Sequence, residues 1–251
     1  MSIYNIISED IKNNDINRVS TITVGVVTDI NDPEKLGRVK VKLLNRTTSN
    51  YETDFIRVMT PMSGANWGAF FFPEVGDEVL VAFCDGDILK PYVLGSLWNE
   101  KRKPPVELKN KKNDIREIKT KSGHSIIFDD GKGEEKITLV TSKGLNLSLE
   151  DKGETITLSD KNNKNKIIID SKKGSISVQA SKRIELSTNS AKLILNGSSG
   201  SAELKSGNSL KIDSNRLELQ GKSAAEMNST GQTTVKSSGM TNIKGSIVKI
   251  N

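Results

Sequence analysis

The side chains that most often perform chemistry are scarce in this sequence. It contains one histidine, His124, and one cysteine, Cys84. These numbers exclude an internal disulfide and a multi-histidine metal site within one chain, and no second histidine or nearby cysteine completes a catalytic dyad with His124. We expect His124 to be buried or to cap a turn, and Cys84, at the end of an apolar segment, to be a small buried hydrophobic residue. Only three copies of His124 meeting on the axis of a trimer could bind a metal.

Two further motifs resemble ligand-binding loops, but their spacing fails. Asp129-Asp130-Gly131 begins like a calcium loop, yet the twelfth position is Val140 where an EF-hand has glutamate. Gly221-Lys222-Ser223 ends like a phosphate-binding loop, but the position of its required first glycine is occupied by Arg216. We interpret the first motif as a turn and assign no ligand to the second.

Two carboxylate pairs are the remaining candidates for acid–base chemistry. They are Glu134 with Glu135, and Asp85 with Asp87. Both lie in turn contexts, which favours solvated carboxylates over an acid/base couple. The sequence therefore predicts no catalytic residue, no cofactor and no metal site, and we expect a protein that is not an enzyme.

The aromatic residues and prolines are confined to the first part of the chain. The two Trp, three Tyr and six Phe of this 251-residue chain all lie at or before Phe128, and the last of the six prolines is Pro105. The rest is dominated by Ser, Thr, Asn, Lys, Gly, Ile and Leu, so two domains with different packing are expected. No stretch approaches the roughly 18–20 apolar residues of a membrane span, and the start does not resemble a signal peptide. We expect synthesis in a bacterial cytoplasm and exit by a route other than ordinary secretion.

The net charge of +6 is unevenly distributed, with −1 in residues 1–117 and +7 in residues 118–251. A basic excess can indicate a nucleic-acid partner. Here the lysines are scattered singly between apolar positions, which is typical of a soluble surface. No nucleic-acid partner is expected.

The pattern of hydrophobic residues divides the chain into four parts. Residues 1–20 are a polar lead-in with a short helix expected over Ile6–Ile16, and residues 21–98 read as an OB-fold barrel. Residues 99–117 form a charged linker stiffened by Pro104-Pro105, and residues 118–251 form a repetitive shaft. Expected strands of the barrel are Thr21–Thr28, Arg38–Leu44, Asp54–Met59, Gly68–Phe72, Glu78–Phe83 and Pro91–Leu97. We attribute the aromatic residues of this part to a barrel core wide enough for rings.

The shaft repeats one short strand and one turn. Apolar pairs recur at i and i+2, and their first members are separated by 8, 11, 11, 9, 8, 9, 9, 8 and 7 residues. The pairs are Ile137/Leu139, Leu145/Leu147, Ile156/Leu158, Ile167/Ile169, Ile176/Val178, Ile184/Leu186, Leu193/Leu195, Ala202/Leu204, Leu210/Ile212 and Leu217/Leu219. A period of this kind is the signature of a β-solenoid.

A coil of about eight residues is too short to enclose a core of its own. Each unit buries only about two aliphatic side chains, worth roughly 1.5–3 kcal/mol each, against an ordering cost of about 1–2 kcal/mol per residue. Three chains that each supply one wall of a shared prism would solve this. The repeat therefore predicts an all-β protein in which an intertwined, homotrimeric β-helix follows the OB-fold, with an axis too narrow for rings.

The one strong apolar cluster of the barrel is Phe70-Phe71-Phe72, close to Trp67. In a strand, Phe70 and Phe72 would lie on one face and Phe71 on the other. One face should fill the barrel. The other face, with Trp67, is a candidate interface, either between protomers or with another protein.

The order of barrel, linker and shaft resembles the central spikes of contractile injection systems, such as VgrG-type spikes and baseplate spikes of phages and tailocins. Val24–Val41 resembles the opening of the family's OB domain, with its D-P-x-x-x-G-R-V turn. Lys121–Ile137 resembles the strand pair with which these spikes enter the β-helix. A third motif is matched by Trp67, Gly68, Phe71, Pro73, Gly76, Glu78, Val79, Val81, Phe83, Gly86, Asp87, Pro91, Gly95 and Asn99.

The departures from this family shape what the resemblance implies. VgrG-type spikes commonly carry a large hub region before the OB domain, and only about 20 residues precede it here, so a separate hub protein is expected. No lysozyme-like insert separates the barrel from the shaft. The histidine-rich, iron-binding apex of some phage spikes has no counterpart, which implies a separate PAAR-type tip protein seated near Ile247, Val248 and Ile250.

The resemblance implies a structural spike that punctures the target cell envelope mechanically and carries a tip protein or effectors. It would be part of a phage tail, a tailocin or a type VI-like particle. Release of that particle from the producing cell is one expected outcome. Two alternatives stay open. A glycan-binding or depolymerising β-helical tail protein should show longer coils and clustered carboxylates, and an OB-fold nucleic-acid-binding protein should show exposed aromatics among basic residues.

Overall fold

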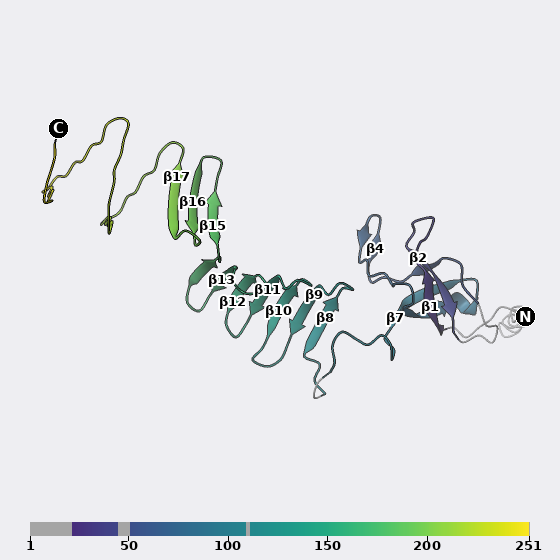
Figure 1. Cartoon of the computed structure of the whole chain (residues 1–251). Helices are drawn as coiled ribbons and strands as arrows, with labels where there is room; N and C mark the ends of the chain where they lie inside the picture. Colours follow the sequence, from purple (N-terminus) through teal and green to yellow (C-terminus); the bar gives the residue numbers. More distant parts are fainter. Residues whose placement is uncertain (1–21, 45–50, 109–110, 251) are drawn as a thin grey trace, which may run out of the picture. The chain divides into compact units, whose positions relative to one another are not determined.

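The computed structural model describes residues 22–44, 51–108 and 111–250. The regular elements in these ranges are strands, apart from one short 3-10 helix, η1 (Cys84–Gly86) (Figure 1). No helix within the described ranges is long and apolar enough to cross a membrane. The chain divides into two compact units, Met1–Gln179 and Ala180–Asn251. The helix expected over Ile6–Ile16 lies outside the described residues.

The first part of the chain forms a closed five-stranded barrel, which confirms the predicted OB-fold. Its strands are β1 (Ile22–Asp29), β2 (Arg38–Leu43), β3 (Ile56–Val58), β6 (Glu78–Phe83) and β7 (Pro91–Leu97). They close in the order β1-β2-β3-β7-β6, with β6 returning to β1. Neighbours are antiparallel except β3 and β7, which run parallel. Alternation along the strands sends one set of side chains inward, as the sequence pattern predicts.

The core of this barrel is aliphatic. Its fully buried side chains are Val27, Val39, Val41, Val79, Val81 and Val93. Phe83 is buried among them, while Tyr51 and Phe72 pack against the cluster from its edge. The expectation of a core wide enough for rings holds for Phe83, which is buried there, and for Tyr51 and Phe72 at its edge. Valines fill most of the core, and Trp67, Trp98, Phe70 and Phe71 lie exposed on the surface of the barrel.

A hairpin stands beside the barrel where a longer strand was predicted. Strands β4 (Ser63–Gly64) and β5 (Trp67–Gly68) pair across Ala65 and Asn66, and Asn66 has a positive φ of 63°. The predicted strand Gly68–Phe72 does not form beyond Gly68. The alternation expected for the three phenylalanines therefore fails as well.

The predicted repeat forms an antiparallel meander in the first unit (Figure 1). Seven strands pair in chain order, each with the strand before and after it. They are β8 (Ile115–Lys119), β9 (Ser125–Asp129), β10 (Lys136–Val140), β11 (Asn146–Glu150), β12 (Thr155–Ser159), β13 (Lys166–Asp170) and β14 (Ser175–Gln179). One short strand and one turn per repeat is confirmed, and β8 begins within the range assigned to the linker. The apolar pair of β11 is Leu147/Leu149, two residues later than the predicted pair Leu145/Leu147. Leu145 lies in the preceding turn.

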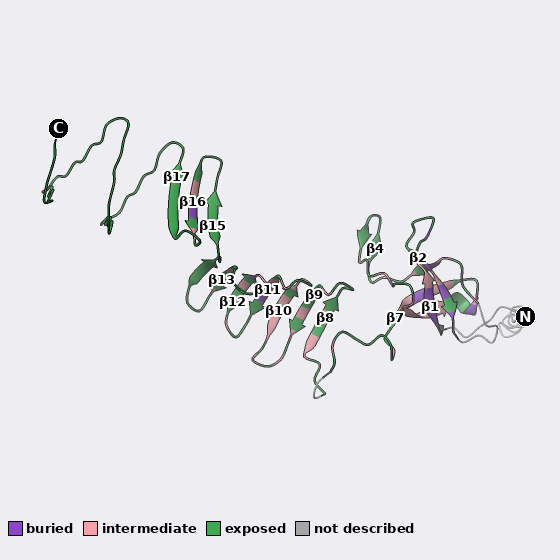
Figure 2. Cartoon of the chain, in the orientation of Figure 1, coloured by how far each residue is buried: buried purple, intermediate pink, exposed green. Residues whose placement is uncertain are grey.

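The second unit contains a three-stranded meander of the same kind. Its strands are β15 (Arg183–Ser187), β16 (Ala191–Asn196) and β17 (Ser201–Ser206), again paired in chain order. Residues 207–250, all of them described, contain no strand, so the pairs Leu210/Ile212 and Leu217/Leu219 form none within this chain. Each of these residues is exposed (Figure 2).

Candidate assembly surfaces

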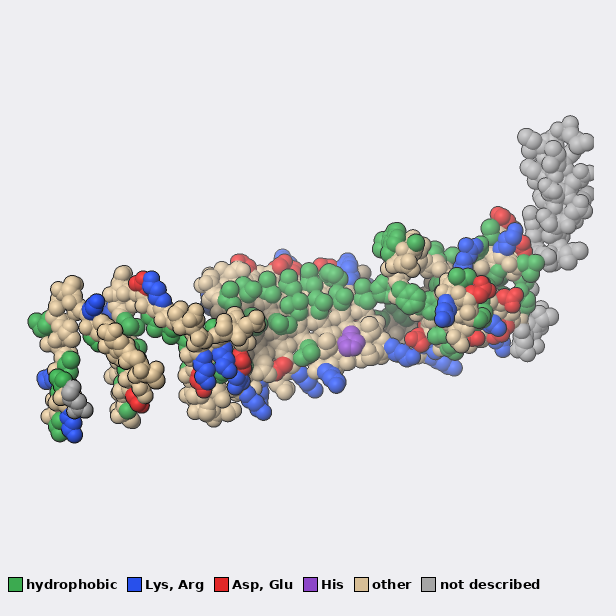
Figure 3. Space-filling view, turned by 90° about the horizontal axis from the view of Figure 1, so that it is seen from above, with side chains coloured by type: hydrophobic (Ala, Val, Ile, Leu, Met, Phe, Trp, Pro, Cys, Tyr) green, Lys and Arg blue, Asp and Glu red, His purple; other side chains and the backbone are tan. Residues whose placement is uncertain are grey.

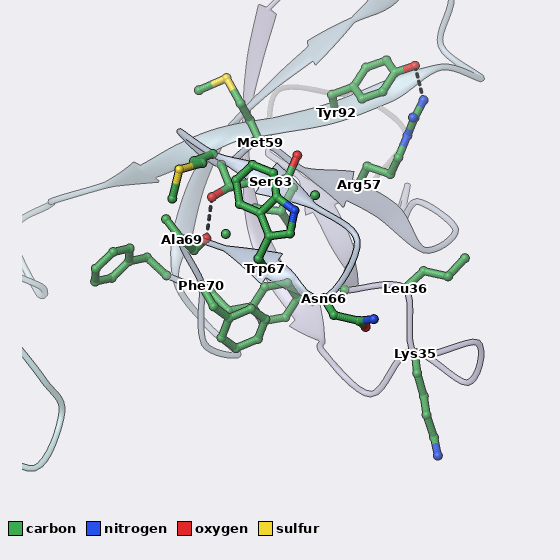
Figure 4. A pocket seen from close by; sticks show the side chains of 18 of the residues that line it. Lys35, Leu36, Arg57, Met59, Ser63, Asn66, Trp67, Ala69, Phe70 and Tyr92 are labelled. Atoms are coloured by element: carbon green, nitrogen blue, oxygen red, sulfur yellow. Dashed lines mark hydrogen bonds between the residues drawn. The ribbon is translucent and has the colours of Figure 1, made fainter.

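The aromatic patch is an exposed cluster on the barrel made of Met59, Met62, Trp67, Phe70 and Phe71. Figure 4 shows that it borders an open cleft of about 940 Å³ between the β4–β5 hairpin and strands β3 and β7. Trp67 is 61% exposed and Phe70 is 82% exposed. Large apolar side chains exposed together on a surface mark a site of contact with another protein.

The position of Trp67 depends on the glycine opposite it. Trp67 pairs with Gly64 across the hairpin. A Cβ atom added to Gly64 would lie 2.1 Å from Cε2 of the Trp67 indole. The ring therefore lies directly over the glycine, and any larger residue at position 64 would displace it.

The segment after the hairpin is tied back to the barrel. The Thr60 hydroxyl donates a hydrogen bond to the carbonyl of Ala69 at 2.5 Å (Figure 4), and the Ala69 N–H donates to the carbonyl of Met62 at 2.9 Å. Phe70 and Phe72 stack with their ring centroids 5.4 Å apart. Because Phe72 packs against the core, this stack holds Phe70 in a fixed position at the surface.

On the other side of the cleft the wall is polar. Arg57 on β3 donates a hydrogen bond from Nη2 to the Tyr92 hydroxyl on β7 at 2.7 Å, and its guanidinium lies 4.8 Å from the centre of the Tyr92 ring. A cation held over an aromatic ring is positioned without being neutralised. The cleft thus combines an apolar wall with one fixed positive charge.

The D-P-x-x-x-G-R-V motif forms a turn that borders the same cleft. Asp32 accepts hydrogen bonds from the backbone N–H groups of Glu34 (3.1 Å) and Leu36 (2.9 Å). Arg38 donates to both its carboxylate oxygens, from Nη2 at 2.7 Å and from Nε at 3.0 Å. These bonds from Arg38, with help from the backbone N–H groups, hold the pKa of Asp32 well below its usual range. Asp32 and Arg38 therefore shape the turn that carries Lys35 and Leu36.

The second surface is the apolar face of the β8–β14 meander, called here the apolar sheet face. Its side chains form two rows that run across all seven strands. The first row holds Ile118, Ile126, Leu139, Leu147, Leu158, Ile167 and Val178, and the second holds Arg116, Phe128, Ile137, Leu149, Ile156, Ile169 and Ile176. Every member except Arg116 is apolar. Figure 3 shows hydrophobic side chains as a continuous band over this sheet.

These rows are exposed in the single chain. Apart from Leu147, which is half-buried, their apolar members range from 37% exposed for Ile126 to 71% for Ile176. The opposite face is mostly polar, and its central row holds Glu117, Ile127, Thr138, Ser148, Thr157, Ile168 and Ser177. A sheet with one apolar and one polar face is built to be covered on the apolar side.

The β15–β17 meander has the same two-faced pattern. Ile184, Leu186, Leu193, Leu195, Ala202 and Leu204 share one face. The other face carries the ion pairs Arg183–Glu185 (2.5 Å) and Lys205–Glu203 (2.6 Å), whose hydrocarbon stems flank the buried Ile194. Charges of both signs identify that face as the solvent side. The uncovered side is again the aliphatic one.

The turns of the long meander are stabilised by local hydrogen bonds and ion pairs. Thr141 Oγ1 accepts from the Leu145 N–H at 3.0 Å, and Gly144 in this turn has a positive φ of 83°. At the opposite edge Lys152 pairs with Glu134 at 3.6 Å and Lys172 with Glu154 at 3.7 Å, each joining one turn to the next. These exposed pairs contribute little stability individually, but they bring successive turns into register.

His124 and Cys84 are the two residues for which the sequence predicts a structural role and no catalytic one. His124 caps a turn, as expected, since its Nδ1 accepts a hydrogen bond from the Ser142 N–H at 3.3 Å, and it is exposed. Cys84 was expected to be buried but lies exposed in η1, because the chain turns there instead of continuing β6. The hydrogen bond and negative charge of Asp85 raise the pKa of the Cys84 thiol, which disfavours a reactive thiolate.

The acidic loop after β9 is a turn, as its failed calcium spacing predicted. The Gly131 N–H donates to Asp129 Oδ1 at 3.0 Å, and the Gly133 N–H donates to Glu135 Oε1 at 2.9 Å. The bond from Gly133 lowers the pKa of Glu135. Among the described residues, no three His, Cys, Asp or Glu side chains are grouped so that they could hold a metal ion.

The structure brings the predicted interface residues Trp67 and Phe70 together at the cleft, and Phe72 stacks on Phe70 while it packs against the core. Sequence reasoning missed Met59, Met62 and Gly64. The sequence does contain a turn signal at this point, because Gly64 and Asn66 flank Ala65, and this signal could have revealed the hairpin. The residues predicted to seat a tip protein, Ile247, Val248 and Ile250, are exposed.

Comparison with known proteins places these surfaces in context. Residues 23–98 match the model of the type VI secretion system/phage-baseplate injector OB domain. The chain is 29% identical over 127 residues to the type VI secretion system spike protein VgrG1b of Pseudomonas aeruginosa, a match covering 47% of this chain and 17% of that protein. It is 36% identical over 78 residues to VgrG1a of the same organism, covering 30% of this chain and 12% of that protein.

A relative from a second organism matches over a similar length. VgrG3 of Vibrio cholerae is 29% identical over 124 residues, covering 47% of this chain and 12% of that protein. The chain thus matches less than a fifth of the length of these curated relatives. The resemblance to VgrG-type and baseplate spikes that the motifs indicated is confirmed, and the barrel matches the injector OB domain.

Proposed function

We propose that the chain is the structural central spike of a contractile tail or injection baseplate and that three copies assemble into its shaft. Its work is mechanical: contraction of a surrounding sheath drives the shaft through the target cell envelope. The shaft carries a PAAR-type tip protein or effectors at its C-terminal end, near Ile247, Val248 and Ile250. The barrel seats the spike on a separate hub protein, and no catalytic activity is part of this role.

The apolar sheet face is the observation that carries the proposal. Seven strands expose two rows of side chains that are aliphatic except for Arg116 and Phe128, and covering each apolar side chain gains up to roughly 1.5–3 kcal/mol. A five-residue strand carries only two side chains of this face. Three such walls meeting edge to edge enclose a narrow core of six side chains per layer, which leaves no room for water.

The strand direction supports the mechanical role. Backbone hydrogen bonds join each strand of the meander to the next, so the ladder runs from strand to strand along the sheet. Strands about 4.8 Å apart with every interior N–H and C=O paired give a stiff wall. A spike must transmit force without buckling, and this ladder resists compression along its length.

The aromatic patch is the surface that we assign to the hub. It combines a tryptophan, two phenylalanines and two methionines around a cleft with Arg57 on its wall. Tryptophan, aromatic and arginine side chains dominate the binding energy of protein interfaces. The stacking of Phe70 on Phe72 pre-positions the patch, which reduces the entropy lost on docking.

A substitution in the apolar sheet face tests the assembly. In Leu158→Asp, three carboxylates would be brought together in a dry core, and burial of unpaired charge is strongly unfavourable. Light scattering coupled to size-exclusion chromatography should give the mass of a single chain, 27.4 kDa.

The matched control is the neighbouring residue on the opposite face of the same strand. Thr157→Asp adds the same charge to the solvent side of β12 and should leave a mass three times that of the chain. If Leu158→Asp assembles as well as the unmodified chain, the apolar sheet face is not the interface and the proposal is wrong.

A further inference from the structure

The cleft beside the aromatic patch carries positive charge among its apolar side chains. The charged residues that line it are Lys35 and Arg57, and none of its lining residues within the described part of the chain is acidic. Figure 4 shows Trp67 between Phe70 on one side and Arg57 with Lys35 on the other. The surface therefore changes from apolar to positive across one tryptophan, and a partner with complementary charge fits it better than a purely apolar one.

Arg57 is held in place, yet it forms no ion pair with any of the described residues. Its Nη2 donates one hydrogen bond to the Tyr92 hydroxyl at 2.7 Å, and its guanidinium lies 4.8 Å from the centre of the Tyr92 ring. The acidic residues of the neighbouring turn are engaged elsewhere, because Asp32 and Glu34 lie 2.7 Å and 2.9 Å from Nη2 of Arg38. A guanidinium has five N–H donors, so Arg57, which is exposed, has donors to offer a partner.

The chemistry of a guanidinium selects the group that it binds. Two of its parallel N–H groups match the two oxygens of a carboxylate, and such charge-assisted hydrogen bonds are about twice as strong as neutral ones. On a protein, that carboxylate is the side chain of aspartate or glutamate. A partner that placed an uncharged residue over Arg57 would remove water from the guanidinium and return less in exchange.

The apolar wall indicates what the rest of the partner is made of. Met59, Met62, Trp67 and Phe70 are exposed around the same cleft, and methionine adapts its shape to apolar side chains. A single strand of nucleic acid also stacks on aromatic rings, but it needs a groove of positive charge that follows its backbone. Two lining cations do not make such a groove, and methionines offer no stacking face. The observations therefore favour a protein.

We infer that the hub segment docked in this cleft carries a large apolar side chain close in sequence to an aspartate or glutamate, and that Arg57 selects the carboxylate. This inference rests on the proposed docking of the hub at the aromatic patch. The apolar side chain packs against Trp67 and the carboxylate binds Arg57, so the cleft fixes the direction in which the segment runs. Lys35, at the edge of the cleft, adds an attraction that salt screens.

Two capped peptides that differ in one residue test the inference. The first holds one leucine and one aspartate among alanines, and the second has asparagine in place of the aspartate. Each is titrated into the full chain with Trp98→Phe, so that Trp67 is the remaining tryptophan and its fluorescence reports binding. The aspartate peptide should bind about tenfold more tightly than its twin, as one charge-assisted hydrogen bond predicts. This preference should weaken as the salt concentration rises.

Substitutions at Arg57 show whether the guanidinium causes the preference. Arg57→Met should abolish it, and Arg57→Lys, which keeps the charge but loses the paired N–H groups, should reduce it. The matched control is Lys90→Met, which also removes one positive charge but from an exposed residue outside the cleft, so the preference should be unchanged. The melting temperature of each variant separates a lost preference from a lost fold.

Equal binding of the two peptides, no binding of either, or a preference that persists in Arg57→Met would overturn the inference. Oligothymidylate is titrated in the same way, and tighter binding of it than of the aspartate peptide would assign the cleft to nucleic acid instead. Light scattering of the same samples keeps the two proposals apart. A mass three times that of the chain without a peptide preference leaves the spike proposal intact, whereas a mass of one chain contradicts the spike whichever peptide binds.

Discussion

At the scale of single residues, the best-defined interaction is the pairing of Asp32 with Arg38. Both carboxylate oxygens and two backbone N–H groups meet in one turn, and the carboxylate is buried. Each part of the D-P-x-x-x-G-R-V motif has a role there: Asp32 accepts, Arg38 donates, and Gly37 has a positive φ of 69°. The motif is thus a device for building the turn, and chemistry is not required to explain its charges.

This pairing makes the barrel sensitive to acid. The pKa of Asp32 is lowered in the folded chain by the hydrogen bonds from Arg38, so the ionised form stabilises the fold at any pH above the ordinary carboxyl pKa of about 4. That contribution is lost as the pH falls below about 4 towards the lower folded value. The melting temperature of Asp32→Asn should therefore be lower than that of the unmodified chain at pH 7, and the difference should shrink at pH 3.

Tryptophan fluorescence is a selective readout for this experiment, because Trp67 and Trp98 both lie in residues 21–98 and the shaft contains no tryptophan. Asp87→Asn is a suitable control, since the Asp87 carboxylate accepts one hydrogen bond from the Leu89 N–H at 2.9 Å and pairs with Lys90 at 3.5 Å, without an arginine partner like that of Asp32. A difference between Asp32→Asn and the unmodified chain that stays constant from pH 7 to pH 3 would show that the charge of Asp32 does not stabilise the barrel.

At the scale of elements, the β4–β5 hairpin decides where the aromatic patch lies. It contributes nothing to the buried core, yet it fixes Trp67 over Gly64 and leads into the Phe70–Phe72 stack. An element with few buried contacts can change without unfolding the barrel. In the proposed function, its role is to present these side chains to a partner.

Gly64→Ala should move the Trp67 indole without destabilising the barrel. The added methyl group would overlap the ring, so the ring must turn towards solvent. In a Trp98→Phe background, the fluorescence of Trp67 should shift to longer wavelength and be quenched more by acrylamide, with an unchanged melting temperature. Gly95→Ala is the matched control, because a Cβ at Gly95 meets nothing within 4 Å. Equal spectra for the two variants would mean that the indole does not rest on Gly64.

Strands were the part of the fold that the sequence predicted best. Alternation of valine with arginine and lysine predicted β2, the apolar run Glu78–Phe83 predicted β6, and the aliphatic pairs predicted nearly every strand of the meanders. Phe70-Phe71-Phe72 misled the prediction, because β-propensity suggests a strand while Gly68, with φ of 143°, ends the hairpin just before it. Cys84 misled it for a similar reason, since Asp85 has a positive φ of 53° and turns the chain immediately after Phe83.

At the scale of the whole molecule, the explanation for the uneven distribution of aromatic residues has changed. The barrel core is mostly aliphatic with one buried ring, Phe83, and four of the nine rings in residues 21–98 are exposed, namely Trp67, Phe70, Phe71 and Trp98. The apolar sheet face carries one ring, Phe128 on β9, which is the last aromatic residue of the chain, and its other members are aliphatic apart from Arg116.

The direction of the strands could not have been predicted from the repeat alone. A period near nine residues fits both a coil that continues in one direction and a strand that reverses at each turn. Turn residues such as Gly144 and Gly174, each with a positive φ, mark the reversals once the structure is known.

The mass of the full chain in solution tests the central claim most directly. Size-exclusion chromatography with light scattering should give three times the chain mass of 27.4 kDa, and the assembly should resist SDS on an unheated gel. A mass of one chain, or of two, would contradict a spike built from three walls.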